Sequence, residues 1–161
     1  MSATRVVCFG NAWHGDDGFG LHVHRRLRER GVQAIDAGTA GLNALPHFEG
    51  CAKAVIVDAL HTGGRVGAVH RLRACDLRPP GGEFSLHEFG VENLLAALCA
   101  QPQQPPEIVL IGAEVGDISP FTDGLSEPVE AALPTAVDLV IIEIGARALA
   151  GARQTRLMSP M

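Results

Sequence analysis

Two adjacent carboxylates, Asp16 and Asp17, lie in a glycine-rich segment, residues 9–20, between an apolar run and a helical pattern. In open α/β sheets, ligands bind in the loops that follow the carboxyl ends of the strands. Exposed N–H groups and the dipole at the start of the next helix stabilise negative charge. We therefore expect both carboxylates to be ionised and available to a ligand. The alternative is that one caps the helix and the other is solvated.

Two further polar residues lie at comparable places in the chain. Asp58 closes a continuously apolar run, residues 54–57, and His87 comes just before a helical pattern. If the strands are parallel neighbours, Asp17, Asp58 and His87 face the same edge of the sheet and can converge. Taken singly, Asp58 could cap a turn and His87 could bond a backbone carbonyl. Their joint placement favours a shared site.

Two carboxylates and one imidazole suit a borderline divalent ion such as nickel, zinc or iron(II). Such a set leaves coordination positions open for water or for a donor from a partner protein. His14, inside the acidic segment, is a weaker candidate for the same site. His22 and His24 are two residues apart, cannot share a helix face, and are expected on the surface. No motif surrounds the other histidines, which are His47, His61 and His70.

Apolar runs alternate with helical periodicity along the chain. The expected strands are residues 5–9, 32–36, 54–60, 66–72 and 108–115, of which 66–72 is an edge or antiparallel strand. The expected helices are residues 18–30, a short helix through Leu42 and Leu45 that ends near Pro46 to Gly50, 91–99, a helix that opens at Ser126 with Pro128 in its first turn, and 135–149. This order predicts an α/β three-layer sandwich, a mostly parallel twisted sheet of about five strands with helices on both faces.

The 161 residues fit one domain, expected over residues 1–150, followed by a tail at 151–161 that lacks periodicity and is expected to be mobile. The net charge of −5 argues against a general nucleic-acid binder, which needs a basic face. No apolar run reaches the roughly 18 residues of a membrane span. The four cysteines form no Cys-x-x-Cys pair, and Cys8 is expected to be a buried thiol. We expect a cytoplasmic protein without a membrane or nucleic-acid partner.

A glycine-rich turn between strand and helix is also typical of dinucleotide-binding proteins. Here residues 15–20 do not supply Gly-x-Gly-x-x-Gly, and the two carboxylates would repel a pyrophosphate at the helix start. The chain also lacks a Gly-x-Ser-x-Gly elbow and a His-Glu-x-x-His helix. The sequence therefore favours carboxylate and imidazole chemistry.

Five segments in register, from Val6 to about Leu149, resemble the nickel-iron hydrogenase maturation endopeptidases. These enzymes remove a carboxyl-terminal peptide from the hydrogenase large-subunit precursor. The resemblance implies an α/β protease of that precursor. The matching segments are Phe9-Gly10-Asn11 with Gly15-Asp16-Asp17-Gly18-Phe19-Gly20, Asp36-Ala37-Gly38-Thr39-Ala40-Gly41, Val55-Ile56-Val57-Asp58-Ala59, Ser85-Leu86-His87-Glu88 and Leu110-Ile111-Gly112-Ala113-Glu114.

The resemblance carries the family's three metal-contacting and catalytic positions over to Asp17, Asp58 and His87. It leaves Asp36, Gly38 and Thr39 available to bind the precursor. The chain departs from the family pattern at two positions: Ala37 stands where a glycine is usual, and His14 stands where an apolar residue is common. The family implies that the nickel is supplied by the precursor, so no permanently bound metal is expected.

Three hypotheses remain open from the sequence. The first is an endopeptidase that checks for nickel in the precursor, with Asp17 or Asp58 as the general base. The second is a hydrolase that holds its own divalent metal at Asp17, Asp58 and His87. The third is a non-catalytic α/β binding module. Metal content separates the first two, because only the second predicts a stoichiometric ion in the purified protein.

Overall fold

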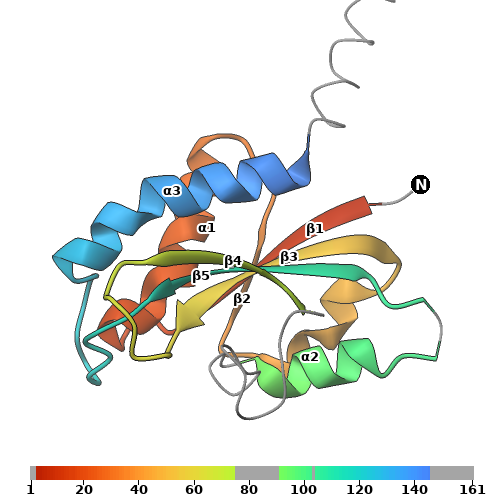
Figure 1. The fold of residues 1–161 in the computed structure, drawn as a ribbon, viewed down its shortest axis with the longest axis horizontal. Helices are drawn as coiled ribbons and strands as arrows, with labels where there is room; N and C mark the ends of the chain where they lie inside the picture. Colours follow the sequence, from red (N-terminus) through yellow and green to blue (C-terminus); the bar gives the residue numbers. More distant parts are fainter. Residues whose placement is uncertain (1–2, 75–90, 103, 146–161) are drawn as a thin grey trace, which may run out of the picture.

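A computed structural model describes residues 3–74, 91–102 and 104–145 of the chain. Five strands form one sheet in the order β2-β1-β3-β5-β4 (Figure 1). All neighbouring strands are parallel except β4 and β5, which are antiparallel. The strands are β1 (Ala3–Phe9), β2 (Ile35–Gly38), β3 (Cys51–Leu60), β4 (Val69–Arg73) and β5 (Glu107–Glu114). The predicted mostly parallel sheet and its antiparallel edge strand are confirmed.

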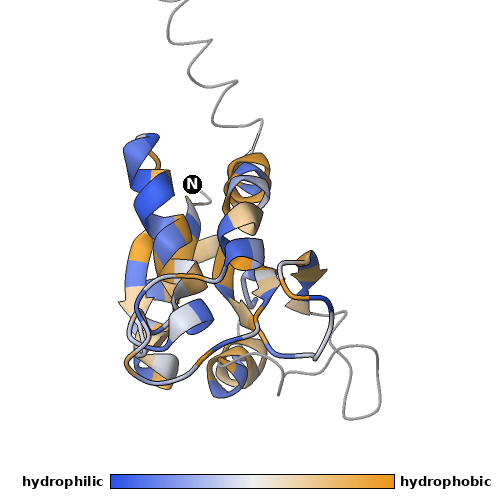
Figure 2. Cartoon of the chain, turned by 90° about the vertical axis from the view of Figure 1, so that its left-hand side faces the viewer, coloured by the Kyte–Doolittle hydropathy of each residue, from blue (hydrophilic) through white to orange (hydrophobic). Residues whose placement is uncertain are grey.

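Helices cover both faces of this sheet, as predicted. Helices α1 (Phe19–Glu29) and α3 (Glu127–Ile144) lie side by side on one face (Figures 1 and 2). The other face is covered by α2 (Glu92–Cys99) and by η2 (Gly41–Phe48), a 3₁₀ helix. A single 3₁₀ turn, η1 (Gly15–Gly18), connects β1 to α1 and contains both carboxylates of the acidic segment.

The apolar runs in the sequence are explained by burial on both faces of the sheet. In β1, Val6 and Cys8 pack toward α1 and α3, whereas Val7 and Phe9 pack toward η2 and α2. Side chains alternate between the faces of a strand, so a strand covered on both faces is apolar at every position. Cys8 is fully buried, as expected, and burial raises the pKa of its thiol.

The second strand begins later than predicted. The strand expected over residues 32–36 begins only at Ile35, because the preceding residues close the end of α1. Gly31 has a φ of 74°, and the Val32 amide donates to the Leu27 carbonyl, 2.9 Å away. This left-handed turn after the last helical residue is a common helix ending. Apolar side chains at residues 32–34 therefore pack beside a helix end and outside the sheet.

The helices predicted separately from Ser126 and over residues 135–149 are one helix in the structure. Pro134 lies inside α3 and does not start a new helix. The short helix expected through Leu42 and Leu45 is the 3₁₀ helix η2, which ends at Phe48, within the expected range. The end of the predicted helix at 146–149 and the tail at 151–161 lie outside the described residues. Among the helices that the structure describes, none is long and apolar enough to cross a membrane.

Candidate active site

The carboxyl ends of the parallel strands meet at one edge of the sheet, at the left of Figure 1. Asp17 lies in η1, just after β1, and Asp58 lies in the neighbouring strand β3. Both side chains line one cavity of about 150 Å³, together with Gly38 and Thr39 after β2. The structure thus brings Asp17 and Asp58 together. His87 lies outside the described residues.

Asp58 is buried, with 6% of its surface exposed. It follows the apolar run 54–57, and β3 continues for two further residues to Leu60, where the strand was predicted to end. The Ala59 amide donates to Asp58 Oδ1 over 2.8 Å. Burial raises the pKa of Asp58 to about 7, and the negative charge of Asp17 acts in the same direction. This carboxyl group therefore holds and releases its proton near neutral pH.

Asp17 is partly exposed, and its backbone is fixed inside a tight turn. Its carbonyl accepts from the Asn11 amide, and its own amide donates to the His14 carbonyl. The Asp17 carboxylate Oδ1 lies 3.6 Å from His61 Nε2. The nearby Asp17 carboxylate raises the pKa of His61, which favours the protonated ring and an ion pair.

His61 corrects the expectation that this histidine lies apart from the site. It follows Leu60 at the end of β3, three residues after Asp58, and faces the Asp17 carboxylate. The charges of Asp58 and Glu114 also raise the pKa of His61. The sequence signal for His61 is the Asp-x-x-His spacing at the end of a buried strand. This spacing is weak on its own, because no motif surrounds His61.

Asp16 has a structural role and is not available to a ligand, contrary to the expectation for both carboxylates. It is fully buried, and its oxygens accept hydrogen bonds from the Gly116 amide and from the Ser126 amide and hydroxyl, at 2.7 to 3.0 Å. Neither Asp16 nor Asp17 caps α1, so the capping alternative is wrong as well. Asp16 instead anchors the start of α3 beside η1.

Two glycines of the acidic segment allow backbones to come close together. A Cβ on Gly20 would lie 2.0 Å from the Phe9 carbonyl oxygen, so only glycine lets α1 start directly beside the end of β1. A Cβ on Gly10 would lie 2.5 Å from the Asp17 carbonyl oxygen. These contacts place Asp17 at the edge of the sheet and explain why the chain needs glycine there.

The three residues assigned to substrate binding lie at the end of β2. Gly38 and Thr39 line the cavity with Asp17 and Asp58. Asp36 is exposed and does not line the cavity. Its carboxylate accepts from the Gly38 amide over 3.0 Å, and the Gly10 amide donates to the Gly38 carbonyl. Asp36 therefore shapes the turn that supplies this wall of the cavity.

A third carboxylate, Glu114, is buried at the end of β5. It accepts hydrogen bonds from the amide and the hydroxyl of Thr62. These bonds hold the loop that follows His61 against β5. Within the described part of the chain, no three His, Cys, Asp or Glu side chains lie close enough to hold a metal ion by themselves.

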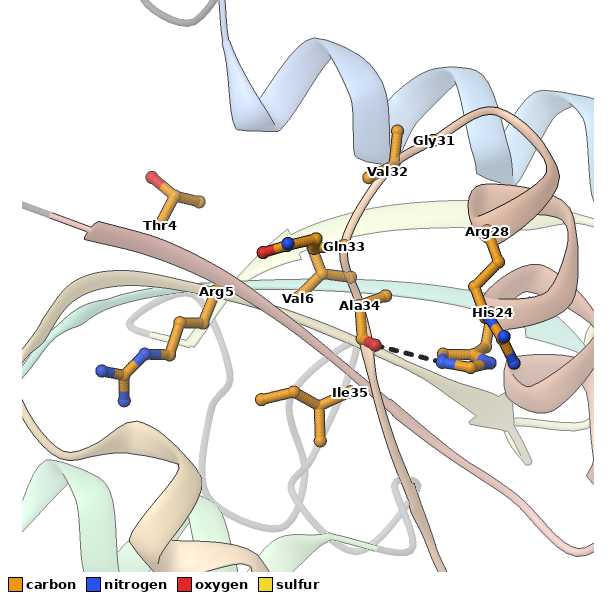
Figure 3. Close-up of a pocket in the computed structure, with 10 residues that line it drawn as sticks. All are labelled: Thr4, Arg5, Val6, His24, Arg28, Gly31, Val32, Gln33, Ala34 and Ile35. Carbon is orange, nitrogen blue, oxygen red and sulfur yellow. Dashed lines mark hydrogen bonds between the residues drawn. The ribbon is translucent and has the colours of Figure 1, made fainter.

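A larger cavity, of about 750 Å³, lies at the opposite end of β1. Its walls come from the start of β1, from α1 and from the connection to β2 (Figure 3). His24 Nε2 is bonded to the Ala34 carbonyl there, so this histidine, expected on the surface, is half-buried. Arg5 and Arg28 line this cavity, and of the residues that the structure describes no Asp or Glu does.

Comparison with known proteins identifies the family to which the chain is similar. A family model described as "Hydrogenase maturation protease" matches residues 20–143, more than half of the chain. The coenzyme F420 hydrogenase subunit delta of Methanothermobacter thermautotrophicus is 32% identical, covering 87% of this chain and 93% of the relative. The hydrogenase expression/formation protein HoxM of Azotobacter vinelandii is 29% identical, covering 94% and 78%.

Solved structures show the same fold. The NiFe hydrogenase maturation protease HybD from Thermococcus kodakarensis superposes with a TM-score of 0.67 at 27% identity, covering 87% of this chain and 97% of that one. The maturating endopeptidase HybD from E. coli gives a TM-score of 0.69 at 24% identity, covering 96% and 94%. The sheet with Asp17 and Asp58 at one edge is thus similar in architecture to known proteases.

Proposed function

We propose that this chain, which belongs to the hydrogenase maturation protease family, removes the carboxyl-terminal peptide of a nickel-iron hydrogenase large-subunit precursor after nickel insertion. The observation that carries the proposal is the placement of Asp17 and Asp58 in one small cavity at the carboxyl ends of the strands. That edge is where open α/β folds bind ligands. We expect this reaction to take place in the cytoplasm.

The nickel of the precursor is the feature that Asp17, Asp58 and His87 would recognise. Carboxylate and imidazole donors suit this ion, and three protein donors leave positions for ligands from the precursor itself. The set contains no thiolate, which keeps affinity for free nickel modest. A precursor without nickel would lack the ion that these three side chains bind, so its scissile segment would not be held at the site.

Peptide hydrolysis at this site needs an activated water and a polarised carbonyl. Nickel in the precursor would polarise the scissile carbonyl, and a carboxylate would accept the proton of the attacking water. We assign that role to Asp17, because it is partly exposed whereas Asp58 is buried. The proton then passes to the departing amine as the carbon–nitrogen bond breaks.

Gly38 and Thr39 would bind the backbone of the scissile segment. Both line the cavity beside Asp17, and their turn is held by the Asp36 carboxylate. Asp36 would then act on the substrate through the shape of this turn. His14 lies in the same loop as Asp17, and its backbone is occupied by hydrogen bonds to Asn11 and Asp17.

The test incubates the chain with a nickel-loaded large-subunit precursor and follows the precursor mass. The wild type and the surface variant Asp138→Asn should release the carboxyl-terminal peptide, since Asp138 is exposed on α3 and pairs with Arg30. Asp17→Asn and Asp58→Asn should leave the precursor intact. Failure of the folded wild type to shorten it would refute the proposal, and a stoichiometric metal ion in the purified chain would favour a resident-metal hydrolase.

A further inference from the structure

Two loops at the site are joined by backbone hydrogen bonds. The loop after β1 and the loop between β5 and α3 form a short parallel bridge at His14 and Thr122. The Thr122 amide donates to the Trp13 carbonyl, and the Gly15 amide donates to the Thr122 carbonyl. The Asp16 amide donates to the Asp117 carbonyl over 2.8 Å. These bonds make the two loops one ordered surface.

The turn that carries Trp13 is closed by Asp17. The Asp17 carbonyl accepts from Asn11, and the Asp17 amide donates to His14, so the two bonds bracket Trp13. Trp13 is further fixed by its own amide, which donates to the Asn11 side chain over 3.0 Å. The backbone of Trp13 therefore has a set position relative to the turn that carries the candidate catalytic carboxylate.

Large apolar side chains are exposed on these two loops. Trp13 is 70% exposed, Phe121 is 94% exposed and Ile118 is 41% exposed. In the described residues only two other large apolar side chains are comparably exposed, Leu42 and Ile142. Exposed apolar side chains that gather in one place are typical of interaction sites, and Trp is among the residues that contribute most to binding.

Phe121 is unusual in its backbone as well. Its φ of 59° is in the left-handed region, and no other non-glycine residue of the described segments has a positive φ. A β-carbon makes this conformation unfavourable, and the exposed ring makes no packing contacts that would offset the cost in free energy. Residues held in such conformations concentrate at functional sites. Folding alone gives no reason for a phenylalanine at this position.

We propose that Trp13, Ile118 and Phe121 form a docking surface that binds the protein substrate beside the active site. This inference rests on the proposed function. A protease must hold a polypeptide against its catalytic carboxylate, and this surface begins on the turn that Asp17 closes. Two exposed acids, Asp117 and Asp123, lie in the same loop. The matching surface of the substrate is therefore apolar with basic residues around it.

Kinetics with the nickel-loaded precursor test this surface. The double variant Trp13→Ala/Phe121→Ala should raise KM roughly ten-fold and leave kcat within about two-fold of wild type. Ile142→Ala removes an equally exposed apolar side chain from the distant end of α3 and should change neither constant. Phe121→Gly should raise KM without lowering Tm, because glycine tolerates the left-handed backbone.

Binding can be followed independently of cleavage, because Trp13 is the only tryptophan of the chain. In protein labelled with fluorotryptophan, the single fluorine NMR signal should shift or broaden when precursor is added. An unchanged signal together with an unchanged KM in the double variant would overturn the docking surface while cleavage by the wild type stands. A shifted signal without any cleavage would support docking and refute the proposed function.

Discussion

The imidazole of His61 lies 3.6 Å from the Asp17 carboxylate, so the end of β3 positions a side chain that belongs to the turn after β1. Asp58 lies in β3, three residues before His61, which directly follows the last residue of the strand. Asp58 and the imidazole that faces Asp17 are therefore held by one short stretch of chain. This arrangement makes His61 a positioning residue for Asp17.

Removal of His61 should lower activity through Asp17. Partners that orient a metal-binding or catalytic group typically contribute about 10-fold to 100-fold when they are mutated. We expect His61→Ala to reduce kcat for precursor cleavage by roughly ten-fold, with little change in KM. His61→Gln, which can still donate a hydrogen bond, should recover part of the loss. An equal loss of kcat in both variants would contradict positioning by a hydrogen bond. His61 would then act through its charge, or without involving Asp17.

Mutation of the two adjacent aspartates should affect different properties, stability in the case of Asp16 and activity in the case of Asp17. Asp16→Ala removes the acceptor of three buried hydrogen bonds and should destabilise the fold by about 3 kcal/mol. Asp17→Ala removes a partly exposed side chain and should change stability by less than about 1 kcal/mol, although cleavage is lost. Urea unfolding of the two variants measures the first effect. A larger destabilisation by Asp17→Ala than by Asp16→Ala would contradict the assigned roles.

Asp58 should make the stability of the protein dependent on pH. Burial raises the pKa of Asp58 to about 7 in the folded state, above its ordinary value of 3.8. The folded state therefore keeps a proton that the unfolded chain has released. The stability from this proton is complete below the unfolded pKa and is lost as the pH rises through the folded pKa.

In the variant Asp58→Asn the side chain at position 58 is neutral at every pH. This variant therefore does not lose stability in this way as the pH rises. At about pH 8 it should be more stable than wild type by on the order of a few kcal/mol, and the difference should shrink toward pH 4. Urea unfolding of metal-free protein at both pH values measures it, with exposed Asp138→Asn as the matched control. A difference that is the same at both pH values would contradict a buried, proton-binding Asp58.

The sheet could be predicted from the sequence because burial on both faces leaves continuous apolar runs, as in residues 54–57 of β3. The end of α1 was harder to predict. Val32 is apolar and β-branched like a strand residue, yet its amide closes the helix end and its side chain packs against the core beside the sheet. The local sequence pattern is the same for a buried strand and for this helix end. Only the tertiary contacts decide which of the two forms.

The site was predictable where a polar residue follows a run of apolar strand residues, as Asp58 does within β3 and Asp17 does in the turn after β1. The different roles of Asp16 and Asp17 were not, because they depend on contacts with Gly116 and Ser126, a hundred or more residues away in the chain. The same holds for the partnership of His61 with Asp17. Only the crossing order of the strands, with β3 between β1 and β5, brings these side chains together.

The central claim is that the carboxylates beside β1 and in β3 act together with His87 on nickel held by the substrate. The most direct measurement compares cleavage of the same large-subunit precursor with and without nickel by metal-free enzyme. The account predicts that only the nickel-loaded precursor loses its carboxyl-terminal peptide, and that Asp17→Asn and Asp58→Asn leave it uncut. Equal cleavage of both precursors by the wild type would contradict the account.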